Sequence, residues 1–321
     1  MPAHALFRPE DTRFEVDVDP LIESLRAVLP GEGLIVHEAG RRAYECDGLS
    51  AYKQLPLLVA VPETVDQVQA VLRLCHEAGV PVVTRGSGTS LSGGSLPHPQ
   101  GLLLAMGKFN RINAIDPERR IARVEPGVRN LAISEAAAPH GLYYAPDPSS
   151  QIACSIGGNV GENAGGVHCL KYGLTVHNVL AVRMITMTGE GTTIGSAALD
   201  SPGLDLLALM HGSEGMLGVI VEVTVKLLPN PLTKQVLMAS FDDVEQGGHA
   251  VAGIIAKGII PGGLEMMDGA AIQAAEDFVH AGYDTDAAAI LICELDGSAA
   301  EVADQMETVQ ACLREHGATR I

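Results

Sequence analysis

The feature that most constrains this chain is a segment rich in glycine and serine that directly follows a short apolar run. Residues 84–94 read Thr-Arg-Gly-Ser-Gly-Thr-Ser-Leu-Ser-Gly-Gly, after the run Val80–Val83, which is typical of a buried strand. Consecutive small residues let backbone N–H groups converge on an anion without obstruction by Cβ atoms. The pattern therefore favours a site for a pyrophosphate. The alternative is a mobile Gly/Ser turn with no ligand.

Two common phosphate-binding loops do not fit this segment. A Rossmann loop needs a third glycine where Leu91 stands, followed by a helix that Pro97 and Pro99 exclude. A Walker A loop needs Gly-Lys-Ser/Thr after the four-residue spacing, but Gly94-Ser95 follows instead. Any nucleotide-binding fold here is therefore of another type.

Composition excludes several classes of protein. The 321 residues carry a net charge of −18, with no Trp and only five Phe and six Tyr, so nucleic acid and anionic membrane surfaces are poor partners. The six cysteines form no C-x-x-C pair, so we expect no metal or iron–sulfur site within the chain. Neither a signal peptide nor a membrane span is evident, and we expect a cytoplasmic protein.

Changes in pattern divide the chain into three stretches. Residues 1–52 are a lead-in, 53–231 a first domain that opens with a strand–helix–strand, and 232–321 a second α+β unit. Thr64 is the predicted N-cap of the first long helix. The passage 145–173 is glycine-rich with little periodicity, and a loop of that length inside a compact domain is usually functional.

Two further glycine-rich segments make the pattern specific. The motifs RGSGTSLSGG, PDPSS, IGGNVGENAGG and GSEGMLGVI, in this order, resemble the FAD-binding domain of the vanillyl-alcohol oxidase/p-cresol methylhydroxylase (PCMH) superfamily. VHCLKYGLTVHNVLAVR and GIIPGGLEMMD are similar to the D-2-hydroxyacid dehydrogenase branch, which includes the FAD-binding subunits of glycolate oxidases. The resemblance implies an α+β fold: a two-subdomain FAD-binding domain of PCMH type at 53–231, followed by a partial ferredoxin-like cap at 232–321.

The resemblance also implies a cofactor and its binding residues. Some relatives link the flavin covalently through a histidine in the first loop, where this chain has Thr89, so non-covalent FAD is implied. The residues implied to bind FAD lie in or beside the motifs. They are Arg85, Gly86, Ser87, Gly88, Thr89, Ser90, Asp147, Ser155, Gly158, Asn159, Glu162, Asn163, Gly165, Glu214, Gly215, Gly218, Val219 and Ile220.

The implied activity is oxidation of a 2-hydroxy acid, glycolate or D-lactate, to the 2-oxo acid. Electrons would pass to a partner, with iron–sulfur and second flavin-binding subunits of a complex implied, and membrane association only through such subunits. Members of the branch carry a late H-x-G-D-G-N-x-H motif that this sequence lacks, so we expect the chain to be C-terminally incomplete. The alternatives are a D-lactate or D-2-hydroxyglutarate dehydrogenase, a non-catalytic FAD-binding module of a complex, and a nucleotide-binding protein without redox function.

The catalytic residues are not identified by the sequence. Removing the hydroxyl proton of a 2-hydroxy acid requires a base, and His168 and His177 flank the second glycine-rich segment. Lys171 lies between them and could bind an anion. All three are weak candidates, because a lone histidine in a loop more often has a structural role.

Overall fold

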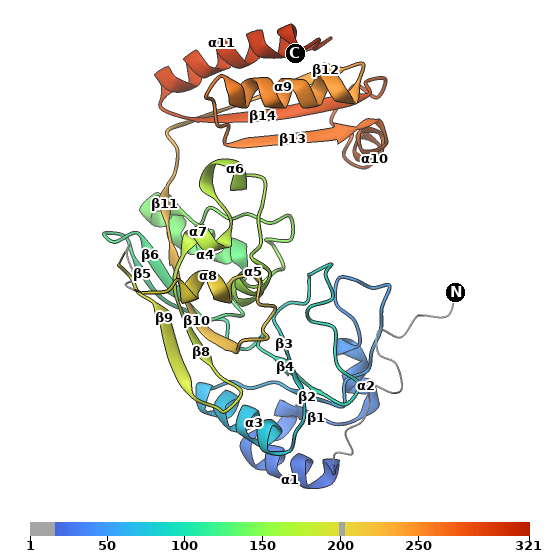
Figure 1. The fold of residues 1–321 in the computed structure, drawn as a ribbon, viewed down its shortest axis with the longest axis vertical. Coiled ribbons are helices and arrows are strands. Elements are labelled where there is room, and N and C mark those ends of the chain that lie inside the picture. Colours follow the sequence, from blue (N-terminus) through green and yellow to red (C-terminus); the bar gives the residue numbers. More distant parts are fainter. Residues whose placement is uncertain (1–16, 199–202) are drawn as a thin grey trace. The chain divides into compact units, whose positions relative to one another are not determined.

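The computed structural model describes residues 17–198 and 203–321, which form two units (Figure 1). The first unit contains the chain up to Tyr144 and the segments Pro148–Ala164 and Leu174–Leu228. The second contains Ala145–Asp147, Gly165–Gly173 and Pro229–Ile321. The passage 145–173 is thus shared: its middle belongs to the first unit and its ends to the second.

The first sheet of the first unit carries the strand that leads into the glycine-rich loop. Its order is β1 (Leu34–Ile35), β2 (Leu58–Ala60), β4 (Leu102–Ala105), β3 (Val82–Arg85), with β2, β4 and β3 parallel. The helices α1 (Val18–Val28) and α3 (Val65–Glu77) contact each other, and α2 (Glu38–Arg41) follows β1. As predicted, Thr64 caps α3. Its hydroxyl accepts a hydrogen bond from the Gln67 backbone N–H, and the Gln67 side-chain oxygen accepts one from the Thr64 backbone N–H.

The second sheet of the first unit is antiparallel. Its order is β5 (Ile112–Asp116), β6 (Ile121–Val124), β10 (Val219–Lys226), β8 (Val179–Ile185), β9 (Gly191–Gly195). The helices of this part are α4 (Asn130–Ala137), α5 (Ile156–Glu162), α7 (Thr175–Asn178) and α8 (Leu206–Met210), and the short strands β7 (Leu142–Tyr143) and β11 (Leu228–Pro229) pair. Ile156 and Val160 of α5 are buried with Val223 of β10, so the glycine-rich helix packs on this sheet.

The glycine-rich passage is more ordered than its composition suggests. We expected a loop over 145–173, but the structure forms α5 and α6 (Cys169–Tyr172) within it. Three glycines lie in α5, where the helix is stabilised by the packing of its buried face rather than by propensity. It ends at Asn163, which adopts the left-handed conformation with φ +51°.

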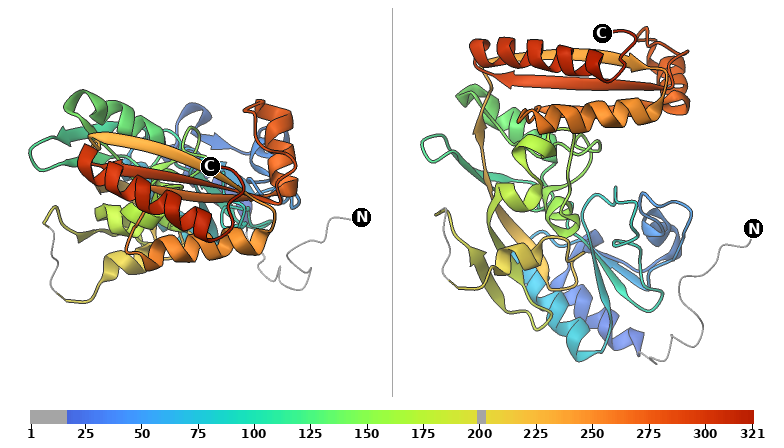
Figure 2. Two further views of the ribbon diagram at one scale, coloured as in Figure 1. Left: turned by 90° about the horizontal axis from the view of Figure 1, so that it is seen from above. Right: turned by 45° about the horizontal axis from the view of Figure 1, so that its top comes forward.

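The second unit is a three-stranded antiparallel sheet covered by helices. The order is β12 (Thr233–Phe241), β14 (Ala289–Gly297), β13 (Gly263–Asp268), and the helices are α9 (Val244–Ala256), α10 (Gly269–Val279) and α11 (Ala299–Glu315). Figure 2 shows α9 and α11 side by side on one face of the sheet. This is the arrangement predicted for a partial ferredoxin-like unit. In addition, the backbone of Arg320 forms a bridge to Ser240 at the free edge of β12.

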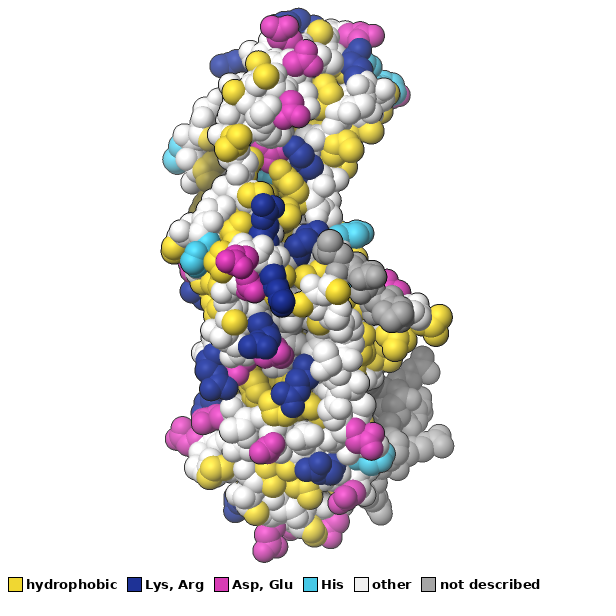
Figure 3. All heavy atoms as spheres, turned by 90° about the vertical axis from the view of Figure 1, so that its left-hand side faces the viewer, with side chains coloured by type: hydrophobic (Ala, Val, Ile, Leu, Met, Phe, Trp, Pro, Cys, Tyr) yellow, Lys and Arg dark blue, Asp and Glu magenta, His cyan; other side chains and the backbone are white. Residues whose placement is uncertain are grey.

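Basic and acidic side chains occur together on the surface (Figure 3). Figure 3 shows Lys and Arg side chains on the face that it presents, although the net charge is −18. Among the residues that the structure describes, no helix has both the length and the apolar composition needed to cross a membrane.

Candidate functional site

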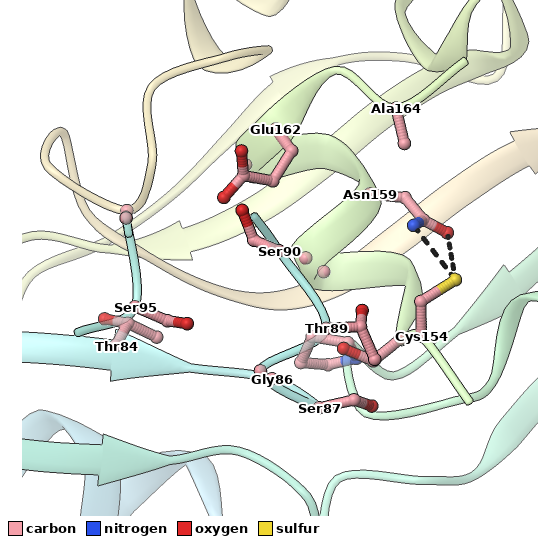
Figure 4. A pocket seen from close by; sticks show the side chains of 18 of the residues that line it. Thr84, Gly86, Ser87, Thr89, Ser90, Ser95, Cys154, Asn159, Glu162 and Ala164 are labelled. Atoms are coloured by element: carbon pink, nitrogen blue, oxygen red, sulfur yellow. Dashed lines mark hydrogen bonds between the residues drawn. The ribbon is translucent and has the colours of Figure 1, made fainter. Parts of the chain in front are cut away.

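One large pocket of the first unit is lined by all three glycine-rich segments (Figure 4). The space within it, counted together with the open solvent at its mouth, is about 1000 Å³. The lining residues predicted from the sequence are Gly86, Ser87, Gly88, Thr89, Ser90, Ser155, Gly158, Asn159, Glu162, Glu214, Gly215, Gly218 and Ile220. The remaining lining residues are Thr84, Gly94, Ser95, Met106, Pro126, Pro148, Ser150, Cys154, Gly157, Gly161 and Ala164.

Two glycines show why larger residues do not fit here. A Cβ atom on Gly86 would lie 2.1 Å from the Ser155 hydroxyl oxygen, so the first loop and the start of α5 are in close approach. Gly218 has φ +155°, and a Cβ atom there would lie 2.1 Å from the Met184 Cε. The glycines therefore form part of the pocket wall with backbone alone.

The wall of the pocket offers hydrogen-bond donors without partners. Ser155 is 2% exposed, and its hydroxyl has no hydrogen-bond partner among the described residues. Among the described residues, the backbone N–H groups of 87–90 also find no acceptor. A buried hydroxyl normally finds a partner, so Ser155, together with the N–H groups of the half-buried loop, gives this wall the chemistry of a site for an anionic or hydroxyl-bearing ligand.

Acidic side chains also line the pocket. Glu162 extends from α5 toward Ser90 of the first loop (Figure 4), and Glu214 lies in the turn before β10. Burial raises the pKa of Glu162 above its usual value; a hydrogen bond from Ser90 opposes this, and the charges of Glu214 and Asp47 add to it. The pocket thus has both unpartnered N–H donors and a carboxylate pair.

Five of the predicted cofactor residues do not line the pocket: Arg85, Asp147, Asn163, Gly165 and Val219. The Arg85 guanidinium is buried and donates to the backbone carbonyls of Tyr44, at 3.1 Å, and Ser95, at 2.7 Å. Arg85 therefore stabilises the conformation of the first glycine-rich loop without lining the pocket. The Asn159 side chain is likewise engaged, since its Oδ1 accepts from Asn130 at 3.0 Å.

Sequence reasoning missed the apolar part of the lining. Met106 follows β4, and Pro126 follows β6, so both reach the pocket only through the pairing of strands. Neither lies in a glycine-rich segment, and no local pattern singles them out. Pro148 and Ser150 lie in the PDPSS motif, so the sequence did contain a signal that could have identified them.

His168 does not line the pocket but lies in the second unit between two carboxylates. Its Nδ1 is 2.6 Å from the Asp147 Oδ2, and its Nε2 is 3.1 Å from the Glu294 Oε1. The hydrogen bond to Asp147 raises the pKa of His168; burial opposes this, and Glu294 adds to it. With both ring nitrogens facing carboxylates, the imidazolium form is favoured, which has no lone pair to accept a proton.

Lys171 and Tyr172 are engaged in the same unit. The Lys171 ammonium pairs with the buried carboxylate of Asp296 and donates to its backbone carbonyl at 2.8 Å. The Tyr172 hydroxyl donates to the same carboxylate. Burial alone would raise the pKa of Asp296, but these two donors hold it below its usual value. The three side chains fasten α6 to the end of β14.

His177, the other candidate for the base, lies on α7 in the first unit and does not line the pocket. Its Nδ1 accepts a hydrogen bond from the Leu174 backbone N–H at 3.0 Å. The residue thus completes the start of a short helix, which is a structural role.

Comparison with known proteins assigns the family. Residues 56–195 match the FAD binding domain family, and residues 230–321 match the C-terminal domain of FAD linked oxidases. The chain combines an FAD binding domain with a C-terminal domain of FAD linked oxidases. The first unit contains the FAD-binding domain, and FAD is the cofactor. The pocket fits FAD on its own features, because N–H donors and the buried Ser155 hydroxyl line a wall built from glycine.

Several curated relatives align along nearly the whole chain. "Glycolate oxidase subunit GlcD" of Escherichia coli (strain K12) is 62% identical over 307 residues, 96% of this chain and 62% of the relative. "Glycolate oxidase subunit GlcD" of Bacillus subtilis (strain 168) is 39% identical over 93% of this chain and 64% of the relative. A "D-lactate dehydrogenase" of Anaerostipes hadrus is 31% identical over 93% and 64%. This chain thus spans under two thirds of the length of these relatives.

Solved structures agree on the fold. An alkyldihydroxyacetonephosphate synthase superposes with a TM-score of 0.80 at 18% identity, covering 98% of this chain and 63% of that one. p-Cresol methylhydroxylase superposes with a TM-score of 0.74 at 19% identity, covering 93% and 64%. At such identities the likeness extends to the architecture alone, which is the predicted α+β arrangement of PCMH type.

Proposed function

We propose that this chain is the FAD-binding part of an oxidoreductase that converts glycolate to the 2-oxo acid. The observation that supports this most directly is the 62% identity with a glycolate oxidase subunit over 96% of the chain. An alignment of that extent includes all three segments that line the pocket. The proposal covers the domain division as well: a lead-in at 1–52, the FAD-binding domain at 53–231 and the cap at 232–321.

The residues of the pocket have distinct functions in this proposal. Bound FAD supplies the acceptor for the hydride that leaves the α-carbon of the acid. The backbone N–H groups of 87–90 and the Ser155 hydroxyl hold the anionic part of the cofactor, while Met106 and Ile220 provide apolar contact. Thr89 stands in the first loop where some relatives have a histidine, so the cofactor is bound without a covalent link.

His168 and Lys171 are proposed to hold the backbone of residues 165–173 in place rather than to take the substrate proton. Each is already engaged by a carboxylate, His168 by Asp147 and Glu294, and Lys171 by Asp296. A base must have a free lone pair near the operating pH, which a doubly engaged imidazolium lacks. These contacts hold the segment that follows the pocket-lining residue Ala164.

The electrons require an acceptor outside this chain. The sequence has no C-x-x-C pair for a cluster, so we propose transfer to an iron–sulfur subunit of a complex that also contains a second flavin-binding subunit. Any association with a membrane would occur through these subunits. Copurification of the tagged chain with an iron–sulfur protein tests this part, and isolation of a catalytically complete enzyme without one would contradict it.

The test of the function is flavin content followed by turnover. The purified chain should show flavin absorbance, and heating should release free FAD into the supernatant. Reduction of an artificial dye is then measured with glycolate, D-lactate and D-2-hydroxyglutarate, using both this chain and the longer form of its relatives' length. Colourless protein that cannot be reconstituted with FAD would overturn the cofactor. Flavoprotein that reduces dye with none of the acids would overturn the activity.

A second candidate is a D-lactate dehydrogenase, favoured by the relative from Anaerostipes hadrus. The two candidates differ only in the substrate side chain, a hydrogen in glycolate and a methyl group in lactate. A pocket that discriminates by one methyl group does so by about 10- to 200-fold. The ratio of kcat/KM for glycolate and D-lactate therefore decides between them.

A further inference from the structure

Two carboxylates of the pocket face the same small gap. A Cβ atom on Gly94 would lie 2.8 Å from the Glu214 Oε2 and 3.1 Å from the Glu162 Oε1. The two oxygens thus border one space that only a glycine leaves open. Both residues line the pocket, Glu162 from α5 and Glu214 from the turn before β10.

The charged groups around this pair do not neutralise it. Among the described residues, no Lys, Arg or His side chain makes an ion pair with Glu162 or Glu214. Asp47 adds a third negative charge and accepts hydrogen bonds from the Leu49 backbone at 2.9 Å and the Ser95 hydroxyl at 3.3 Å. The described chain has no group of side chains here that could hold a metal ion.

The Ser90 hydroxyl donates to Glu162, and the nearby cation Arg85 interacts with Asp47. Both Arg85 amino groups donate to backbone carbonyls, so its charge compensates Asp47 rather than the pair. The Glu162 carboxyl therefore faces a hydroxyl donor and two like charges. Burial and the two like charges favour its neutral form, and the hydrogen bond from Ser90, which favours the ionised form, only partly opposes them.

The same pocket has an independent sign of a ligand, the buried and unpartnered hydroxyl of Ser155. The ligand that the family assigns to it, FAD, contains a pyrophosphate with two negative charges. Placing these charges in a pocket with two ionised carboxylates costs free energy, because water is displaced and the local dielectric falls. One proton on the pair removes much of this repulsion and converts a carboxylate into a hydrogen-bond donor.

We propose that FAD binding is coupled to the uptake of one proton from solvent by the Glu162–Glu214 pair, held on the Glu162 carboxyl. The raised pKa of Glu162 agrees with this choice of site. The inference rests on the FAD site alone and is independent of the acid that is oxidised. It makes FAD affinity decrease as pH rises.

The proton is counted by titration calorimetry of the apoprotein with FAD. Heats are measured at one pH in buffers of different ionisation enthalpy, and the slope gives the protons taken up per FAD. We expect uptake of up to about one proton near neutral pH and a Kd that rises by up to about tenfold per pH unit. FAD fluorescence quenching between about pH 6 and pH 8 provides the Kd independently.

Variants locate the proton on the pair. E162Q carries the neutral form permanently, so it should take up almost no proton and should bind FAD more tightly than the natural chain at the upper end of the pH range. E214Q removes the like charge and should take up a smaller fraction of a proton at the same pH. E77Q removes a charge from the exposed end of α3, outside the pocket, and should match the natural chain in both measurements.

Three outcomes would overturn the proposal. One is FAD binding by the natural chain with no proton exchange, and another is an unchanged proton count in E162Q. If E162Q fails to fold, an unchanged count in E214Q has the same consequence. A natural chain that binds no FAD at any pH would instead overturn the FAD site, and this result is distinguishable because no binding heat is seen in any buffer.

Discussion

Each of the two units brings three carboxylates together, but only the second unit pairs all three with cations. In the second unit Asp147, Glu294 and Asp296 are each matched by a cation, so the cluster is complete within the protein. In the first unit Glu162 and Glu214 line the pocket and form no ion pair in the part of the chain that the structure describes; the nearby Asp47 forms none either, although the charge of Arg85 acts on it. The pKa of Asp296 is lowered and that of Glu162 is raised.

This difference in charge pairing distinguishes a structural cluster from a ligand-binding site. Buried charges stabilise a fold only when partners and hydrogen bonds replace water around them. The second unit meets that condition with its own side chains. The pocket leaves donors and acceptors unmatched, which costs folding free energy and is characteristic of binding sites. Variants that change one charge in each cluster should therefore have opposite effects on stability.

The largest effect is expected from Lys171→Met, which leaves the buried Asp296 carboxylate without its cation. The Tyr172 hydroxyl and the more distant charge of Lys234 would remain to compensate it. We expect the free energy of unfolding to fall by about 3 kcal/mol, measured by urea denaturation. The matched control is Lys257→Met, which removes an exposed ion pair with Glu315 and should cost under about 1 kcal/mol. Equal losses for the two variants would contradict the difference between the clusters.

A somewhat smaller effect is expected from Gly86→Ala. The added Cβ atom would lie 2.1 Å from the Ser155 Oγ, so the Ser155 hydroxyl must rotate out of the position that it holds in the pocket wall. Displacement of this kind costs about 2 kcal/mol, which would raise the Kd for FAD by about 30-fold in fluorescence titrations. Gly107→Ala is the control, since its Cβ would meet no atom within 4 Å. If Gly86→Ala bound FAD as tightly as the control, the close approach would be irrelevant to binding.

A pH-dependent effect is expected from His168→Gln. The folded-state pKa of His168 is raised above its ordinary value, so its stabilisation is fully present below about pH 6.5 and is lost as pH rises through the folded-state pKa. We expect the variant to lose about 1 kcal/mol of unfolding free energy at mildly acidic pH and progressively less at alkaline pH.

The control for this variant is His249→Gln, because that histidine is exposed and reaches Glu245 only at 3.9 Å. It should show little difference from the natural chain at any pH. A loss in His168→Gln that is the same at acidic and alkaline pH would mean that the imidazolium charge does not contribute.

The smallest effect, of opposite sign, is expected from Glu162→Gln in the apoprotein. A carboxyl with a raised folded-state pKa destabilises the fold once pH exceeds its unfolded-state value, so neutralising it should raise the unfolding free energy by about 0.5 kcal/mol at neutral pH. The gain should vanish at low pH, where the natural residue is already protonated. A decrease in thermal stability at neutral pH would show that the two clusters are alike.

Much of the fold was predictable because local patterns specify it. The helix capped by Thr64, the strand Ile121–Val124 and the helices of the second unit follow from periodicity and capping residues. The pairing of His168 with Glu294 was not predictable, since 126 residues separate them and no local pattern links them. For the same reason Met106 and Pro126 were absent from the predicted site, although they line the pocket.

The sequence by itself determined most of the elements, with α5 and α6 as exceptions, and the chemistry of the site. Its glycine-rich segments specify a wall made of backbone N–H groups, because only glycine permits such close approach. Tertiary structure alone decided which charges are matched. It paired His168 and Lys171 with carboxylates of the second unit and left Glu162 beside Glu214, because electrostatic interactions depend on distance and burial, and neither is encoded in the spacing of residues along the chain.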